Sequence, residues 1–473
     1  MNLNRILITA PSSGSGKTLI TCGIMEALKR RKMKVGAFKC GPDYIDPMFH
    51  KKVLNIPSKN LDSFMADENT LKYLFKSQAE QVDISVIEGV MGYYDGLSFD
   101  DTKASTYEVA KITKTPAILV INARGMALSA VAAIKGFIEF AADSGIKGVI
   151  LNRVTKMTFM QLAPVIEEKL GIKVLGFIPE CKDCQLESRH LGLITPAEIS
   201  DINVRLSKMA DLIEENVDLD GIIKIAENAP DFCCDDISEI ENVCEKYYKS
   251  CCDGRKHDDC VKIAVAYDEA FCFYYEDNFE LLKKLGARLE FFSPMKDKKL
   301  PDNISGIMLG GGYPEIYAKQ LSENTQMLDE IRSAYKNKIP IVAECGGFLY
   351  LHREIEDLEH NVCKMAGIID AKAVYTGKLG RFGYIDVELK KKQMYGDVGG
   401  KIKGHEFHYY DSSCNGNDAL AVKPSKKRQW ECINSDEYLE AGFPHLYYYS
   451  NINFARNFVE KCMTTDRYLW KKV

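Results

Sequence analysis

Two segments of this chain combine residue types and spacings that could carry out chemistry. The first, ITAPSSGSGKT at residues 8–18, places Gly16, Lys17 and Thr18 in the order of a phosphate-binding loop. It departs from the standard pattern, because Pro11 stands where the first glycine of G-x-x-x-x-G-K-[ST] belongs. The alternative is an ordinary Ser/Gly turn before a helix. The strand before the turn, the Lys-Thr pair and the helix after it all favour the phosphate loop.

This loop is expected to bind the phosphates of ATP. Backbone N–H groups at a helix N-terminus attract anions, and Gly14 and Gly16 let the backbone approach closely. Lys17 would reach the β- and γ-phosphates, and Thr18 would ligate Mg²⁺. Asn152, at the end of the strand GVILNRV, is expected to bond an adenine edge. The residues expected to bind ATP are Ser13, Gly14, Ser15, Gly16, Lys17, Thr18, Lys39 and Asn152.

Acidic residues follow two further strands of the same region. FKCGPDYIDP, residues 38–47, carries Asp43 and Asp46, and IEGVMGYYDG, residues 87–96, carries Glu88 and Asp95. Ligands of open α/β sheets sit at the carboxyl ends of strands, although a single acidic residue there can simply cap a helix. The expected ligands of the metal are Thr18, Asp43 and Glu88.

The second chemical segment is IPIVAECGGFLYL, residues 339–351. A buried strand ends at Glu344, Cys345 occupies a sharp glycine-containing turn and a helix follows, which is the layout of a nucleophile elbow. A lone buried cysteine is ordinarily a small hydrophobe, but this context favours a nucleophile. The helix N-terminus is expected to lower the pKa of the thiol.

A nucleophilic thiol needs an oxyanion hole and a base. The segment MLGGGYPE, residues 308–315, supplies backbone N–H groups, so the expected oxyanion hole is formed by Gly311, Gly312 and Gly346. His445, in AGFPHLYYYSN, is the expected base, and thiolate, imidazole and oxyanion hole together make an acyl-transfer site. The other histidines of this half are His352, His360, His405 and His408. The last two are expected to line the space between domains.

Strand and helix patterns alternate around these residues, which indicates parallel sheets covered on both faces. The chain is therefore expected to be α/β with two doubly wound domains. Expected strands of the first are residues 6–9, 35–38, 84–88, 117–122 and 148–152, with helices at 18–29, 127–142 and 158–170. Expected strands of the second are residues 261–267, 289–292, 306–309 and 339–343.

The expected domain boundaries follow from a change in composition. Residues 216–260 are acidic, polar and rich in cysteine, and are interpreted as a linker with one helix. The prediction is an ATP-binding domain at 1–215, the linker at 216–260 and a second α/β domain at 261–473. Cys181-x-x-Cys184 and the linker cysteines leave a metal-binding module as an alternative, although adjacent cysteines are poorly spaced for zinc.

Overall composition narrows the class of protein. At 473 residues, two domains are the default, and 46% hydrophobic with 27% charged residues is typical of a globular protein. A net charge of -5 without a basic tail argues against nucleic acid as a partner, and no apolar run predicts a membrane span. Sixteen scattered cysteines and the absence of a signal peptide favour a cytoplasmic location and free thiols.

Several segments together resemble one family, the cobyrinic acid a,c-diamide synthases, which are glutamine amidotransferases of corrinoid biosynthesis. The matching segments are APSSGSGKT, FKCGPDYIDP, EGVMGYYDG, VINARGMALSA, SRHLGL, LGGGYPE, AECGGFLYL, GHEFHYY and the late His445. They follow the family order over nearly the whole chain. The first domain is similar to dethiobiotin synthetase, whose phosphate loop departs from the pattern in a similar way. The second is similar to class I glutamine amidotransferases.

The resemblance implies an ATP- and glutamine-dependent amidoligase. ATP and Mg²⁺ would activate the a and c acetate carboxylates of a small tetrapyrrole as acyl phosphates, and Cys345 with His445 would release ammonia from glutamine. Asp43, Tyr44 and Asp95 would face the corrinoid and the acyl phosphate. Arg189 and His190 would contact substrate carboxylates, or equally be solvated. A homodimer is one oligomeric state that the resemblance leaves open.

One departure and several alternatives accompany this resemblance. Class I enzymes carry Glu two residues after the catalytic His, and the family usually has His there, whereas this chain has Tyr447. What orients His445 is therefore open. Nickel-sirohydrochlorin a,c-diamide synthase shares the fold and the diamidation and is the main alternative. Cobyric acid synthase fits the segments less well, and a nucleotide-switch ATPase would need no nucleophile elbow.

Overall fold

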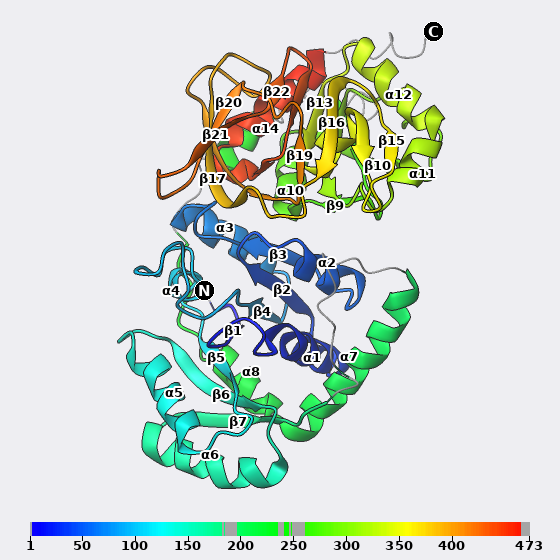
Figure 1. The fold of residues 1–473 in the computed structure, drawn as a ribbon. Coiled ribbons are helices and arrows are strands. Elements are labelled where there is room, and N and C mark those ends of the chain that lie inside the picture. The colour runs from blue at the N-terminus through cyan, green and yellow to red at the C-terminus, as the bar shows by residue number, and fades with distance from the viewer. Residues whose placement is uncertain are drawn as a thin grey trace. The chain divides into compact units, whose positions relative to one another are not determined.

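A computed structural model describes residues 2–181, 184, 196–234, 241–245, 247 and 261–464, without the side chains of residues 196–201. The chain divides into two compact units, Met1–Ile237 and Ser238–Val473. Both are mixtures of helices and strands, as Figure 1 shows. Arg189 and His190 lie outside the described residues.

The first unit is built on a seven-stranded sheet in the order β3-β2-β4-β1-β5-β6-β7, and every pair is parallel. Its strands are β1 (Arg5–Thr9), β2 (Val35–Cys40), β3 (Ser58–Leu61), β4 (Ile84–Glu88), β5 (Ala117–Asn122), β6 (Ile146–Asn152) and β7 (Lys173–Ile178). They are almost entirely buried, as strands covered on both faces must be. The parallel sheet predicted for this region is confirmed. The expected strands lie within it, whereas β3, which has one apolar residue, and β7, which is mostly apolar, were not predicted.

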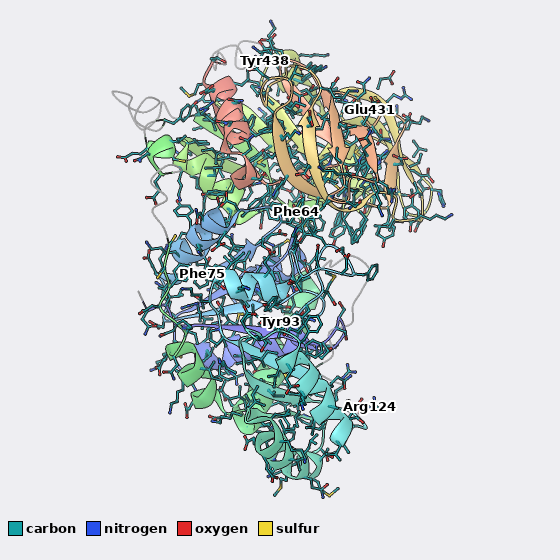
Figure 2. The ribbon with its side chains drawn as sticks, turned by 90° about the vertical axis from the view of Figure 1, so that its left-hand side faces the viewer. Phe64, Phe75, Tyr93, Arg124, Glu431 and Tyr438 are labelled. Carbon is teal, nitrogen blue, oxygen red and sulfur yellow. A yellow bond between two sulfur atoms is a disulfide. The ribbon has the colours of Figure 1, made fainter. Side chains whose placement is uncertain are left out.

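Eight helices accompany this sheet among the described residues (Figure 1). They are α1 (Lys17–Arg30), α2 (Ile45–Lys52), α3 (Glu68–Ala79), α4 (Thr106–Ile112), α5 (Leu128–Glu139), α6 (Lys156–Leu170), α7 (Pro196–Asn216) and α8 (Leu219–Glu227). Apolar side chains of α1, α7 and α8 share one core with the sheet. A second cluster joins Phe75 of α3, labelled in Figure 2, to Phe38 and Phe232, with ring centroids 4.9 and 5.2 Å away. Because α8 belongs to the first core, part of the expected linker packs as structure.

The second unit contains a six-stranded sheet in the order β10-β8-β11-β13-β23-β22. Five strands are parallel and the edge strand β22 is antiparallel. These strands are β8 (Val261–Ala266), β10 (Ala287–Phe292), β11 (Gly306–Leu309), β13 (Ile341–Glu344), β22 (Asn434–Ser435) and β23 (Leu439–Gly442). Its helices are α10 (Glu276–Lys284), α11 (Ala318–Glu323), α12 (Thr325–Lys336), α13 (Gly346–Tyr350) and α14 (Ile452–Thr464).

Three smaller sheets complete this unit. One pairs β9 (Phe271–Phe273) with β12 (Gly311–Gly312), and a second contains β14 (His352–Glu356), β15 (Val362–Lys364), β16 (Ile369–Tyr375) and β19 (Tyr410–Ser412). The third contains β17 (Phe382–Leu389), β18 (Lys401–Phe407), β20 (Ala419–Val422), β21 (Gln429–Cys432) and β24 (His445–Leu446). No helix in the described part of the chain is long and apolar enough to span a membrane.

One expectation about cysteines is wrong. Cys181 and Cys184 form a disulfide, although free thiols were expected throughout. The two residues are three positions apart in sequence, and their Cα atoms lie 5.4 Å apart, which a disulfide can span. A zinc module using this pair is therefore not supported, and the described residues contain no group of three or more His, Cys, Asp and Glu side chains placed to hold a metal ion. Cys251, Cys252 and Cys260 lie outside those residues.

Buried histidines make the stability of the second unit sensitive to acid. His352 is fully buried, its ring nitrogens contact Phe348 O and Ser412 Oγ at 2.8 and 2.7 Å, and burial lowers its pKa to about 4. In the unfolded state the pKa of His352 is near 6.5, so as the pH falls the unfolded protein takes up a proton before the folded protein does. The stability that is present above pH 6.5 is therefore lost as the pH falls from 6.5 toward 4. Between pH 7 and pH 5 the free energy of unfolding decreases, and we expect His352→Gln to make this decrease smaller by about 2 kcal/mol.

Urea unfolding of both proteins at each pH measures this difference. The contributions of the other buried histidines cancel in this comparison, because the native protein and the variant both contain them. Equal pH slopes would contradict the role assigned to His352.

Candidate functional site

The phosphate loop has the backbone that its glycines require. Gly14 and Gly16 have φ values of 75° and 92°, in the left-handed region that favours glycine, and α1 begins at Lys17. A side chain on Gly16 would meet Asn152 Nδ2 at 2.5 Å, so the loop packs directly on the end of β6. Asn152 Nδ2 donates to Ser15 O at 2.9 Å. The side-chain NH₂ group of Asn152, the residue predicted to bind adenine, thus holds the phosphate loop.

A pocket opens beside this loop. Its lining comes from α1, the ends of β6 and β7, and α7, and includes Gly16, Leu19, Asn152, Arg153, Pro179 and Glu180. An apolar lining with polar edges is suited to a flat base. Asn152 lies in the lining of this pocket, beside the phosphate loop.

Lys17 and Thr18 point toward polar groups of neighbouring loops. Lys17 Nζ donates to Ser12 O and Met91 O, at 3.0 and 2.5 Å, and so bridges the phosphate loop and the loop after β4. Burial and the neighbouring Lys39 lower its pKa to about 8. Thr18 Oγ1 donates to Glu88 Oε1 at 2.5 Å. The structure therefore brings the two predicted metal ligands Thr18 and Glu88 together.

Glu88 is the centre of a buried polar network. Lys39 Nζ lies 3.0 Å from its Oε1, and His50 Nε2 lies 3.1 Å from its Oε2. Burial alone would raise the pKa of Glu88, but these partners and Thr18 lower it well below its usual range. His50, fixed by Ser58 Oγ at 3.0 Å on its other nitrogen, is a site residue that sequence reasoning missed. A single histidine on a short helix carries no pattern that could have revealed it.

Of the acidic pair after β2, Asp46 is the one bonded into this network. Its Oδ2 lies 2.5 Å from Lys39 Nζ, whereas Asp43 Oδ1 accepts the Ile45 N–H at 2.8 Å and caps the turn into α2. Burial and Glu88 raise the pKa of Asp46 well above its usual range. Asn60 Nδ2 holds the same turn through Gly41 O and Asp43 O. Tyr44 is buried at the start of α2.

The loop after β4 is anchored to the phosphate loop. A side chain on Gly92 would meet Pro11 O at 2.4 Å, so this contact needs glycine beside the unusual proline. Tyr93, labelled in Figure 2, is buried and donates its hydroxyl to Ser144 O at 2.5 Å. Asp95 Oδ2 accepts the Gly92 N–H at 2.8 Å, so this predicted substrate residue also shapes its own loop.

The second unit contains the expected elbow. Cys345 has φ 47° and ψ -102°, a strained conformation for a non-glycine residue, between β13 and α13. Its N–H donates to Gly442 O at 2.8 Å on the adjacent strand β23. A side chain on Gly347 would meet Leu309 O at 2.1 Å, which explains the second glycine of the turn.

The expected depression of the thiol pKa is wrong for the free protein. Burial raises the pKa of Cys345, and the nearby Glu315 and Glu406 raise it further. The Gly346 N–H lowers the pKa of the thiol, but a helix of only five residues has too small a dipole to outweigh the effect of burial. Burial, together with His405 and His408, lowers the pKa of His445. Thiol and imidazole are therefore both neutral before substrate arrives.

The glycine turn of β12 lies between the elbow and His445. A side chain on Gly311 would meet His445 Cε1 at 2.3 Å, and one on Gly346 would meet Gly312 N at 3.0 Å. The three predicted oxyanion glycines thus cluster with both the nucleophile's turn and the predicted base. Gly310 N–H is used by Tyr274 Oη at 2.7 Å.

His405 and His408 are buried and have partners within the second unit. His405 is paired across strands with His445, and their rings stack with centroids 5.1 Å apart. His408 stacks on Phe443 at 3.8 Å and contacts Glu406 Oε2 at 3.1 Å. Burial lowers the pKa of His405 to about 3 and so disfavours its charged form.

Comparisons with known proteins agree with both halves of this description. Residues 6–194 match the CobQ/CobB/MinD/ParA nucleotide binding domain, and residues 262–442 match the CobB/CobQ-like glutamine amidotransferase domain. Among solved structures, FtsY from Mycoplasma mycoides aligns with 44% of this chain and 67% of its own, at 16% identity and a TM-score of 0.30. That likeness is too weak to support a conclusion.

Curated relatives align with most or nearly all of the chain. The cobyrinate a,c-diamide synthase of Caldanaerobacter subterraneus subsp. tengcongensis is 39% identical, over 98% of this chain and 99% of its own. That of Picrophilus torridus is also 39% identical over the same shares, and that of Methanocaldococcus jannaschii is 40% identical over 86% and 87%. With both domains matched and identity well above 30% along its length, this chain belongs to the family of cobyrinate a,c-diamide synthases.

Proposed function

We propose that this protein uses ATP and glutamine to amidate the a and c acetate carboxylates of cobyrinic acid. The observation that carries the proposal is the presence of a phosphate loop and a cysteine elbow on one chain whose full-length relatives bear that activity as their name. The two units would divide the work, with carboxylate activation in the first and ammonia release in the second.

The activation step follows from the chemistry of carboxylates. A carboxylate acylates poorly, because an oxide would have to leave, whereas an acyl phosphate offers phosphate as the leaving group. The carboxylate oxygen attacks the γ-phosphorus and ADP departs; ammonia then attacks the acyl carbon and phosphate departs. Lys17 and Lys39 would balance charge on the transferring phosphoryl group. Asn152 and the pocket beside the loop would hold the adenine.

The residues around Glu88 fit a magnesium ion held jointly with the phosphates of ATP. Mg²⁺ is bound by one or two protein oxygens plus substrate phosphates, and Thr18 Oγ1 with Glu88 supplies such a pair. Asp43 remains part of the proposal, with Asp46 as the nearer carboxylate to Lys39. Magnesium would neutralise phosphate charge there.

His50 offers a test of this metal proposal. It holds one oxygen of Glu88, and such supporting contacts change metal affinity by about 10–100-fold. We expect His50→Ala to reduce the gain in ATP affinity that Mg²⁺ provides by about that factor, measured by calorimetry with and without the metal. His50→Gln, which keeps an N–H donor, should retain most of the gain. Equal weakening with and without Mg²⁺ would contradict the assignment.

In the second unit, Cys345 would attack the side-chain amide carbon of glutamine. His445 would take the thiol proton and pass it to the departing nitrogen, and water would then hydrolyse the thioester to glutamate. The N–H groups of Gly311, Gly312 and Gly346 would stabilise the oxyanion. Ammonia made in this way is delivered as NH₃ rather than the ammonium ion of neutral solution.

Substrate contacts remain part of this proposal. Tyr44 and Asp95 adjoin the carboxyl edge of the first sheet, where a corrinoid carboxylate would have to meet the γ-phosphate. Arg189 and His190 are proposed as carboxylate contacts from the sequence alone. We also propose a cytoplasmic location and a homodimer, and sedimentation of the purified protein would test the latter.

One experiment separates this function from its main alternative. Purified protein is supplied with ATP, Mg²⁺ and glutamine, together with either cobyrinate or nickel-sirohydrochlorin, and amide formation is followed by mass spectrometry. We expect two amidations of cobyrinate, each requiring ATP. Amidation of nickel-sirohydrochlorin alone would assign the protein to the related diamide synthase instead.

A further inference from the structure

The group that orients His445 is not at the sequence position where an acidic residue would be expected. That position holds Tyr447, whose hydroxyl donates to Asp277 Oδ2 at 3.1 Å. An imidazole base works only in one tautomer, because one nitrogen must be free to accept a proton while the other carries one. Some acceptor on the Nδ1 side is therefore needed.

Glu344 is a carboxylate in the right place. It ends β13, directly before Cys345, and is buried. Its two oxygens have different neighbours: Oε1 accepts the Leu446 N–H at 3.2 Å, and Oε2 lies 3.9 Å from His445 Nδ1. The second distance is in the range of an ion pair, and catalytic contacts of ligand-free enzymes commonly tighten when substrate binds.

The orientation of the ring agrees with this assignment. A side chain on Gly311 would meet Cε1 at 2.3 Å and both ring nitrogens at 3.2 Å, so the ring presents its Cε1 edge to Gly311. The two nitrogens consequently point to opposite sides of that edge. With Nδ1 toward Glu344, Nε2 is left for the substrate side, where the elbow of Cys345 packs on the same glycine turn.

The sheet explains why one residue can serve both partners. β13 and β23 are parallel neighbours, with Glu344 opposite Gly442, and His445 follows three residues later. Cys345 and Glu344 are adjacent in sequence, so their side chains leave the strand end in different directions. The end of β13 therefore carries the nucleophile, Cys345, and also the residue that contacts the base, Glu344. Burial raises the pKa of Glu344 to about 8, and the imidazolium that forms when His445 takes the thiol proton would lower it again, which favours the ionised carboxylate.

We propose that Glu344 is the positioning residue of the glutaminase site: Oε1 fixes the backbone at Leu446, and Oε2 accepts from His445 Nδ1–H. The proposal rests on the function proposed above for Cys345 and His445. His405 on β18 and His408 also act on the imidazole, and both lower the pKa of His445.

Glu344→Gln is the discriminating variant, because its amide oxygen can still accept the Leu446 N–H while its NH₂ group faces Nδ1. We expect kcat for glutamine hydrolysis to fall by at least about 100-fold with KM changed less than about twofold. Ammonium-driven amidation should be unchanged. Glu344→Asp, which retains the carboxylate, should recover part of the rate.

The matched control is Glu440→Gln. Glu440 is buried on the neighbouring strand β23 and accepts the Tyr395 N–H at 3.3 Å. It should retain glutaminase activity. If Glu344→Gln matches the native rate, Glu344 is only a backbone anchor and the inference fails. If Cys345→Ala keeps glutamine-driven activity, the proposed function fails instead.

A measurement on the native protein covers the case in which Glu344→Gln does not fold. Nitrogen-15 chemical shifts of His445, assigned by comparison with His445→Gln, report which ring nitrogen carries the proton. A proton on Nδ1 is expected. A proton on Nε2 in the neutral ring would overturn the proposal.

Discussion

Cys345→Ala is expected to abolish amidation driven by glutamine and to leave amidation driven by ammonium intact. The thiol is the group at the elbow that can form a bond to the glutamine amide carbon, and alanine leaves none. Free ammonia needs no such bond, because it attacks the acyl phosphate directly. The glutamine-driven rate should fall by at least about 10³-fold, equivalent to about 4 kcal/mol in the barrier.

Amide formation with glutamine and with ammonium chloride, measured on the same preparation, checks this result. Cys363→Ala is the matched control, since Cys363 is a free, half-buried cysteine of the same unit. It should behave like the native protein with both nitrogen donors. Survival of the glutamine-driven rate in Cys345→Ala would show that the elbow is not the glutaminase nucleophile.

Lys17→Ala is expected to abolish amidation with either nitrogen donor. Lys17 begins α1 at the phosphate loop, where its ammonium would meet the β- and γ-phosphates. Losing a charge-stabilising donor of this kind costs roughly 10²–10³-fold in rate, and the loss falls on the activation step that both donors share. Lys17 Nζ also bridges Ser12 O and Met91 O, so part of the effect would come from loosened loops.

Lys29→Ala serves as the control for Lys17→Ala. Lys29 lies in the last turn of the same helix, away from the loop, and contacts Glu26 at 3.1 Å. It should keep nearly full activity with both donors. The glutaminase reaction alone is the second readout, because hydrolysis of glutamine by Cys345 needs no ATP chemistry. Loss of ammonium-driven amidation together with retained glutamine hydrolysis would place Lys17 in the activation step, whereas undiminished amidation would exclude it.

Local patterns were sufficient for much of the first unit. Continuous apolar segments such as those of β1, β4 and β5 pair in one parallel sheet, because a strand covered on both faces must be apolar along its whole length. Of the two strands that were not predicted, β3 is SKNL and has little local strand preference, so its pairing with β2 overrode that preference. β7 is KVLGFI, whose apolar residues do favour a strand, so its sequence contained the signal.

In the loops, too, some features follow from the local sequence and others depend on contacts between distant segments. Glycines at 14 and 16 could be identified from sequence because backbone conformation is a local property. The hydrogen bond from Asn152 to Ser15 O joins residues 137 positions apart, and no local pattern encodes it. His50 and Asp46 likewise became parts of the Glu88 network only when α2 packed against β2 and β3.

By itself, then, the sequence determined the two α/β units, the phosphate loop, the elbow at Cys345 and the likeness to one enzyme family, because these depend on short contiguous patterns. Only the tertiary structure decided whether the thiol of Cys345 is protonated and which residues surround His445. Burial, which raises the pKa of Cys345 and lowers that of His445, is summed over segments distant in sequence. For the same reason Glu344, one hundred and two residues before Leu446, could be recognised as a neighbour of the base only after β13 and β23 had paired.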